Sequence, residues 1–210
     1  MQGRARRCGS QEGNALWALL TLGLADERAD QLARNLLQWQ WADGGWNCDK
    51  RPGAINSSFH ETLLPLRALA RYGRERGSEE ALAVARRAAE VFLKRRLFRR
   101  QRDGAVIKPR FLVLCYPAYW HYGILPGLKV MAEVGLIGDP RCAEALDVLE
   151  SKRLPDGGFP AEGRHYNVST DAARYPSRRS LVHWGPVGRT RMNEFVTVDA
   201  LYVLKAAGRG

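Results

Sequence analysis

The sequence predicts an all-helical fold built from repeated antiparallel helical hairpins. Apolar residues recur at three- and four-residue spacing, as at Leu16 and Leu20, which is the period of an amphipathic helix. Asp-Gly turns follow such stretches at Asp43, Asp103 and Asp156. A repeat of about fifty residues made of helix pairs is typical of solenoids and closed helical rings. We therefore expect each hairpin to bury its apolar side on its neighbours.

In the first hairpin, Asn14 is a candidate N-cap for a helix that continues to Leu24. A second amphipathic helix follows and ends at Asp43-Gly44-Gly45, because glycine readily adopts the positive φ that stops a helix. We expect one domain over residues 1–210. Its repeat units cover residues 11–46, 57–104, 117–159 and 194–210, with an Arg-rich insert over 160–193.

The later hairpins carry similar start signals. Ser57 and Ser58 are candidate N-caps for a helix that contains Pro65 and breaks over residues 73–78. A helix over residues 79–96 completes this hairpin. Asp139-Pro140 begins the second helix of the third hairpin. Residues 194–207 predict the first helix of a fourth.

Composition restricts the classes of function. The net charge is +11, and only six of the 33 basic residues are Lys. No nucleic-acid-binding motif accompanies the charge, so we expect arginines spread over helix surfaces and no nucleic-acid partner. The four cysteines form no Cys-x-x-Cys pair, which favours a reducing cytoplasm. No apolar run is long enough to span a membrane, although the basic surface is compatible with contact at a membrane surface.

The segment Gln40–Trp46, QWADGGW, matches the Q-x-x-D-G-x-W repeat of the squalene–hopene and oxidosqualene cyclases. The β subunits of protein prenyltransferases share a looser form of it. The chain resembles this superfamily across nearly its whole length, although its two later copies are degenerate. The resemblance implies an α/α toroid and structural roles for Gln40, Asp43 and Trp46. We expect an N-terminally incomplete ring of about three to four hairpins, with an apolar edge covered by further N-terminal hairpins or by self-association.

The sequence departs from the catalytic marks of these relatives. It has no Asp-x-Asp-Asp acid, and Asn56-Ser57-Ser58 stands where the prenyltransferases place an Asp-x-Cys zinc site. We therefore assign no metal ligand and no cofactor. A less favoured alternative is an unorthodox metal site made by Cys48, His60 and His121.

In such toroids the starts of the inner helices line the cavity. The resemblance therefore implies that segments 8–14, 57–62, 116–122 and 183–195 converge. Catalytic candidates are His60, Glu61, His121 and Glu194. Candidates for substrate binding are Glu12, Trp120, Tyr122, His183, Trp184 and Asn193. Loop arginines able to grip a phosphate or carboxylate, if they are not simply solvated, are Arg164, Arg174, Arg178, Arg179, Arg189 and Arg191.

We expect a protein that binds a small molecule in a central cavity, with an isoprenoid as a candidate ligand. If it is an enzyme, the resemblance implies terpene cyclase-like or prenyltransferase-like chemistry. Two alternatives stay open. An (α/α)-barrel enzyme acting on carbohydrate would need a carboxylate pair, either Glu61 with Glu194 or Glu12 with Glu61. A non-catalytic binding or structural module would need no acid.

Overall fold

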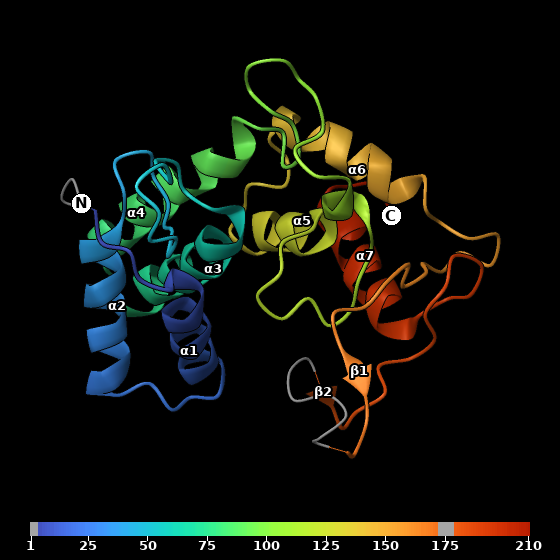
Figure 1. Cartoon of the computed structure of the whole chain (residues 1–210), viewed down its shortest axis with the longest axis horizontal. Coiled ribbons are helices and arrows are strands. Elements are labelled where there is room, and N and C mark those ends of the chain that lie inside the picture. The colour runs from blue at the N-terminus through green and yellow to red at the C-terminus, as the bar shows by residue number, and fades with distance from the viewer. Residues whose placement is uncertain (1–3, 172–178) are drawn as a thin grey trace. The chain divides into compact units, whose positions relative to one another are not determined.

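The computed structural model describes residues 4–171 and 179–210, and this part of the chain is mostly helical (Figure 1). Its seven α-helices are α1 (Gly9–Thr21), α2 (Glu27–Trp39), α3 (Phe59–Arg76), α4 (Glu79–Leu93), α5 (Ile124–Glu133), α6 (Ala143–Glu150) and α7 (Glu194–Ala206). Short 3₁₀ helices lie at η1 (Pro109–Leu112) and η2 (Pro140–Cys142). The prediction of a helical fold is confirmed, while the toroidal arrangement stays a prediction.

The chain forms two compact units. The first ends at Arg96 and also takes in Glu133–Leu136. The second comprises Leu97–Ala132 and Ile137–Gly210. The prediction of a single domain depends on how these two units pack together, and it stays a prediction.

Two antiparallel hairpins form the first unit, as the sequence predicts. Helix α1 packs against α2 and α3, and α3 packs against α4. Asp26 caps α2 by accepting a hydrogen bond from Arg28 N, and Ser78 caps α4 by accepting one from Ala81 N. The core between the helices is apolar and includes the fully buried Phe92. These hairpins bring the first residues of α1 and α3 close together.

Two glycines allow α1 to lie very close to α3. A Cβ atom on Gly13 would be 2.5 Å from the backbone nitrogen of Pro65, and one on Gly9 would be 3.1 Å from the carbonyl oxygen of Glu61. Proline has no N–H to donate, so Pro65 cannot bond the Glu61 carbonyl within α3. The Gly9 and Gly13 spacing of four residues puts both glycines on one face of α1, and the contact follows from their missing side chains.

Gln40 joins the end of α2 to α4. Its Nε2 donates to the carbonyl oxygens of Gly44 (2.7 Å) and Val84 (3.0 Å). Its Oε1 accepts from Arg87 Nε and Nη2. The structural role predicted for Gln40 is therefore confirmed.

Trp46 anchors the turn that follows. It is buried, and its Nε1 donates to the Leu36 carbonyl at 3.0 Å. Its backbone nitrogen donates to Thr62 Oγ1 (3.1 Å), and its carbonyl accepts from Ser58 N (2.9 Å). Asp43 accepts from both the backbone and the hydroxyl of Ser57. These bonds confirm the structural roles predicted for Asp43 and Trp46.

The third copy of the turn repeats two of these bonds in the second unit. Phe159 replaces Trp46, and its backbone nitrogen donates to Thr197 Oγ1 at 2.9 Å. The Phe159 carbonyl accepts from Asn193 N at 2.9 Å. Thr62 and Thr197 are each the fourth residue of their helix, α3 and α7. Two hydrogen bonds of the first Asp-Gly turn thus recur at the third, while the division of the chain into the predicted repeat units stays a prediction.

The sequence predicts a break over residues 73–78, and helix α3 ends within that range, although it runs through the first of the two glycines. It continues to Arg76, and Gly77 ends it with a φ of 65°. Gly73 instead serves helix packing, because a Cβ there would be 2.7 Å from Leu82 Cγ on α4. Gly73 and Gly77 thus have different structural roles, and only Gly77 has the left-handed backbone conformation of a C-cap.

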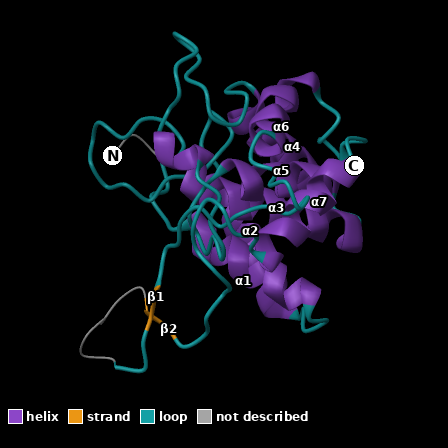
Figure 2. Ribbon diagram, turned by 90° about the vertical axis from the view of Figure 1, so that its right-hand side faces the viewer, coloured by secondary structure: helices purple, strands orange, loops and turns teal. Residues whose placement is uncertain are grey.

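The second unit contains most of α5, all of α6 and α7, and the described part of the long insert, whose two short strands are the orange segments in Figure 2. Lys129 of α5 forms an ion pair with Asp199 of α7. Within the insert, β1 (Asn167–Val168) and β2 (Arg179–Ser180) pair in parallel, with Asn167 opposite Arg179. Helix α7 exposes Val198, Leu201 and Tyr202, whose spacing of three and four residues puts them on one face of the helix. Its proposed cover by other hairpins or by self-association stays a prediction.

Among the described residues, no helix is both long enough and apolar enough to cross a membrane.

Candidate functional site

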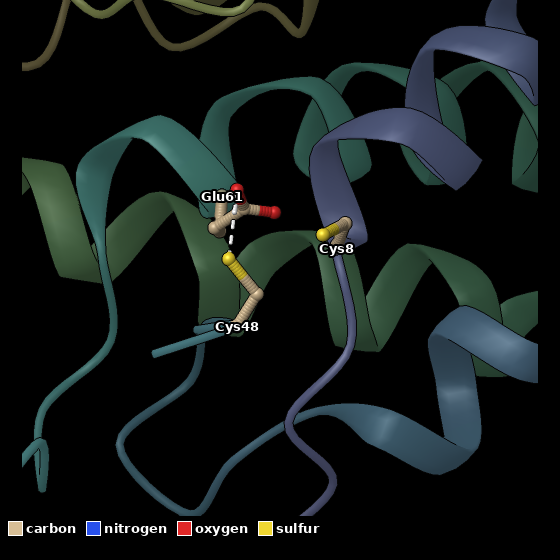
Figure 3. Close-up of side chains that lie close together, drawn as sticks. All are labelled: Cys8, Cys48 and Glu61. Carbon is tan, nitrogen blue, oxygen red and sulfur yellow. Dashed lines mark hydrogen bonds between the residues drawn. The ribbon is translucent and has the colours of Figure 1, made fainter. Parts of the chain in front are cut away.

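Two groups of polar side chains stand out, one in each unit. In the first unit, Cys8, Cys48 and Glu61 place two sulfur atoms and a carboxylate oxygen within 4.8 Å of one another (Figure 3). Cys48 Sγ lies 3.4 Å from Glu61 Oε1. Both cysteines are free thiols and partly exposed, whereas Glu61 is buried. We call these three residues the Cys–Glu cluster.

Three separate segments bring the Cys–Glu cluster together. Cys8 is the N-cap residue of α1, Glu61 lies in the first turn of α3, and Cys48 lies in the loop after Trp46. The Arg6 guanidinium donates to the carbonyl oxygens of Asp49 and Ala54. Arg6 therefore ties the segment that carries Cys8 to the loop that carries Cys48.

Ser10 fixes the orientation of the Glu61 carboxylate. Its backbone nitrogen and its hydroxyl both donate to Glu61 Oε2 at 3.0 Å. The N–H groups in the first turn of a helix lack partners within the helix, so Glu61 caps α1 from a neighbouring helix. Because Oε2 is held in this way, Oε1 faces the thiol of Cys48.

The surroundings favour the protonated form of Cys48. Burial, followed by the negative charge of Glu61 and the hydrogen bond with Cys8, raises the pKa of Cys48 to about 12. A thiol at such a pKa is a poor nucleophile at neutral pH, because the thiolate is the reactive form. By itself, this cluster is therefore not an activated cysteine nucleophile.

The second group surrounds a pocket of about 570 Å³ in the second unit, which we call the basic pocket. This volume is within the usual range for small-molecule sites. Its described lining residues include two arginines and two histidines, and none of these described residues is a carboxylate. The lining residues are Arg110, His121, Arg164, His165, Tyr166 and Asn167.

Stacked rings and a backbone bond organise the basic pocket. The His121 ring stacks on that of His165, with centroids 3.7 Å apart and planes 4° apart, and Trp120 stacks on His121 from 4.0 Å. Arg110 Nη2 donates to the Arg164 carbonyl at 3.2 Å. A guanidinium has five N–H donors, so this bond leaves others for a ligand.

The sequence predicted that four segments converge, and two pairs of them do so within the units. Segments 8–14 and 57–62 meet through the bonds between Ser10 and Glu61. Segments 116–122 and 183–195 meet where Tyr116 stacks on Phe195, with centroids 4.9 Å apart, and Trp184 packs edge-on against both rings. Convergence of all four stays a prediction.

Several predicted site residues have structural partners. The buried Tyr122 donates its hydroxyl to the Leu97 carbonyl at 2.6 Å. The buried Asn193 caps α7 through Val196 N and donates to the carbonyl oxygens of Trp184 and Pro186. These bonds use the polar groups that a substrate would contact.

Other predicted residues lie at the surface. Glu12 and His60 are partly exposed, and His183 and Glu194 are exposed. Of the two proposed carboxylate pairs, Glu61 and Glu194 belong to different units, so this pairing stays a prediction. The pairing of Glu12 with Glu61 is also a prediction.

Of the insert arginines, Arg164 lines the basic pocket, whereas Arg179, Arg189 and Arg191 are exposed. Arg174 and Arg178 lie outside the described residues. The predicted metal alternative of Cys48, His60 and His121 draws on both units and stays a prediction.

Sequence reasoning missed Cys8, Arg110 and His165. Cys8 lies in a segment predicted to face the cavity, and Cys48 precedes the converging segment 57–62 by nine residues, so the position of the two thiols is the signal that points to the pair. His165 follows Arg164 directly, and that basic pair was the available signal. Arg110 lies more than fifty residues earlier in the chain, and no local pattern connects it to them.

No family model, curated protein or solved structure matches this chain.

Proposed function

We propose that this protein binds a small anionic ligand, a phosphate or diphosphate ester, in the basic pocket. The observation that carries the proposal is the pocket lining, in which Arg110 and Arg164 accompany two stacked histidines and no carboxylate stands among the described lining residues. Two guanidinium groups and two imidazoles favour a ligand with several negative oxygens, because charge-assisted hydrogen bonds are the strong ones.

The histidine stack adds a reason for an anion. Two imidazolium rings with centroids 3.7 Å apart repel each other when both carry a proton. A bound phosphate offsets this repulsion and favours protonation.

An isoprenoid diphosphate is the first ligand to test. The pocket supports the anionic end of such a ligand, and the isoprenoid tail rests on the resemblance to the cyclases and prenyltransferases. The proposal is therefore a ligand-binding protein of the squalene cyclase-like or prenyltransferase-like kind. It includes no reaction, because the described residues supply neither the Asp-x-Asp-Asp acid nor the Asp-x-Cys pair of those enzymes.

Calorimetric titration of the full chain tests this proposal with inorganic pyrophosphate, geranyl diphosphate and geraniol. We expect both anions to bind and geraniol to bind much more weakly. The variant Arg110→Gln removes one guanidinium, and the loss of a hydrogen bond to a charged group costs about 1.5–3 kcal/mol. This corresponds to an affinity loss of about tenfold to a hundredfold.

Arg86→Gln is the matched control, because Arg86 is exposed on α4 and its loss lowers the net charge equally. The control variant should bind like the original chain. The proposal is wrong if neither anion binds, or if Arg86→Gln weakens binding as much as Arg110→Gln. Stronger binding of geranyl diphosphate than of pyrophosphate would support the isoprenoid assignment, and equal binding would limit it to the phosphate groups.

A further inference from the structure

We propose that Cys8, Cys48 and Glu61 form a binding site for a zinc ion. The inference is independent of the proposed anion site, because the cluster lies in the first unit and the basic pocket in the second. It rests on the ligand atoms, on the bonds that hold them and on the chemistry of the donor set.

The ligand atoms are close to the spacing that a metal requires. Zinc lies about 2.3 Å from thiolate sulfur and about 2.0–2.2 Å from carboxylate oxygen, so its tetrahedral ligands are about 3.3–3.8 Å apart. In the structure the two sulfur atoms and the Glu61 oxygen lie within 4.8 Å, and Cys48 Sγ and Glu61 Oε1 are already 3.4 Å apart. Closing the set needs a side-chain movement of about 1 Å, without any rearrangement of the helices.

A second layer of contacts holds these ligands in place. Ser10 fixes Glu61 Oε2 through two hydrogen bonds, which leaves Oε1 directed toward Cys48. Arg6 joins the backbone segments of the two cysteines, and Gly9 permits the close contact of α1 with Glu61. Such outer contacts orient the ligands of metal sites and raise their affinity.

The donor set selects the metal. Two thiolates exclude the hard cations Mg²⁺ and Ca²⁺, which take oxygen ligands, and favour zinc among the common divalent ions. Three protein ligands leave the fourth tetrahedral position for water or another small ligand, which is the arrangement of catalytic zinc sites. The partial exposure of both cysteines gives the ion a route into the site.

The test uses the full chain, reduced and freed of metal, and titrated with Zn²⁺ and with Co²⁺ as a spectroscopic probe. We expect one zinc per chain by mass spectrometry of metal content, and a near-ultraviolet cobalt–thiolate absorption band. On the unmodified chain, zinc should protect Cys8 and Cys48 from alkylation. Removal of the zinc by a chelator should make both cysteines reactive again. This last readout needs no variant and so does not depend on variant folding.

The variants Cys48→Ser and Glu61→Gln should each weaken zinc binding about a hundredfold or more, because each removes an anionic ligand. Ser10→Ala should weaken it about tenfold, at the lower end for an outer contact, because the backbone bond to Glu61 survives. The double variant C115A/C142A is the matched control. It removes two thiols of the second unit and should bind zinc normally.

Several results would overturn the inference. The reduced chain could take up no metal, Cys48→Ser could retain full affinity, or the control could lose as much affinity as the cluster variants. Recovery of Cys8 and Cys48 as a disulfide, together with failure of the reduced chain to bind zinc, would assign the pair to thiol oxidation instead. Failure of phosphate binding in the second unit would leave the zinc result unaffected.

Discussion

Replacement of Gly13 by alanine should destabilise the first unit even though alanine is the better helix former. A Cβ at this position would lie 2.5 Å from Pro65 N and 2.6 Å from the carbonyl carbon of Leu64. These are backbone atoms of α3, so they cannot rotate away as a side chain can. Since non-bonded heavy atoms prefer about 3.5–4.0 Å, α1 must move away from α3 by about 1 Å.

The magnitude follows from two opposing effects. Alanine in place of glycine within a helix gains about 1 kcal/mol. Overpacking of a filled contact costs about 1–3 kcal/mol and occasionally more, and the rigid backbone of α3 puts Gly13 at the upper end. We expect Gly13→Ala to lower the free energy of unfolding by about 1–2 kcal/mol. The displaced α1 should also weaken zinc binding, because it carries Cys8.

Urea unfolding followed by circular dichroism measures the stability change. Gly53→Ala is the control, because a Cβ there would meet nothing within 4 Å. This control should be neutral or stabilising by up to about 1 kcal/mol, through the loss of conformational freedom in the unfolded chain. If Gly13→Ala is as stable as the original chain, the close approach of α1 and α3 at this position is wrong.

Two further predictions concern the Gln40 side chain, which bonds the end of α2 to α4, and a buried thiol. Gln40→Ala should lower the free energy of unfolding by about 1–3 kcal/mol, because two backbone carbonyls lose the donor that bonds them. Gln38→Ala, at an exposed position near the end of α2, is the control and should change this free energy by less than about 0.5 kcal/mol in urea unfolding. Equal losses in the two variants would contradict the structural role of Gln40. Burial, followed by the charge of Asp139, raises the pKa of Cys142 from 9.0 to about 11. As the pH rises, the unfolded chain therefore loses this proton before the folded chain does. The contribution of Cys142 to the free energy of unfolding is complete below pH 9.0 and disappears as the pH rises toward 11. The difference in unfolding midpoint between the original chain and Cys142→Ala should therefore shrink over that interval, and a constant difference would refute the assignment.

The elements and the repeat were predictable because their causes are local. Apolar spacing indicates the helices, and paired glycines after an aspartate indicate the turns. The Gln40–Trp46 segment also contains the groups that bond it to α4 and α3. Two of its bonds recur at Phe159, so a pattern of a few residues determines a geometry that appears in both units.

The candidate sites were less predictable because they depend on contacts between distant segments. Glu61 was identified as a candidate, but its partners Cys8 and Ser10 follow from the approach of α1 to α3, which Gly9 and Gly13 permit. In the basic pocket, Arg110 and His165 come together only through the folding of the second unit. They are far apart in the sequence, and no local pattern connects them. The composition of the chain and the spacing of its residues do not indicate which helix packs against a pair of glycines.

The repeat provides a comparison that bears on Glu61. Thr62 and Thr197 occupy the same position of the two repeats, so Glu61 corresponds to Val196, which is fully buried. The fold therefore accepts an apolar side chain here, and a buried carboxylate costs free energy unless it is bonded or paired. Ser10 accounts for one oxygen, which caps α1. The other oxygen lies 3.4 Å from the thiol of Cys48, and the Cys8 thiol completes the cluster. A cation bound between these three groups removes the repulsion among their anionic forms, so the zinc proposal explains a charge that the helical repeat does not require.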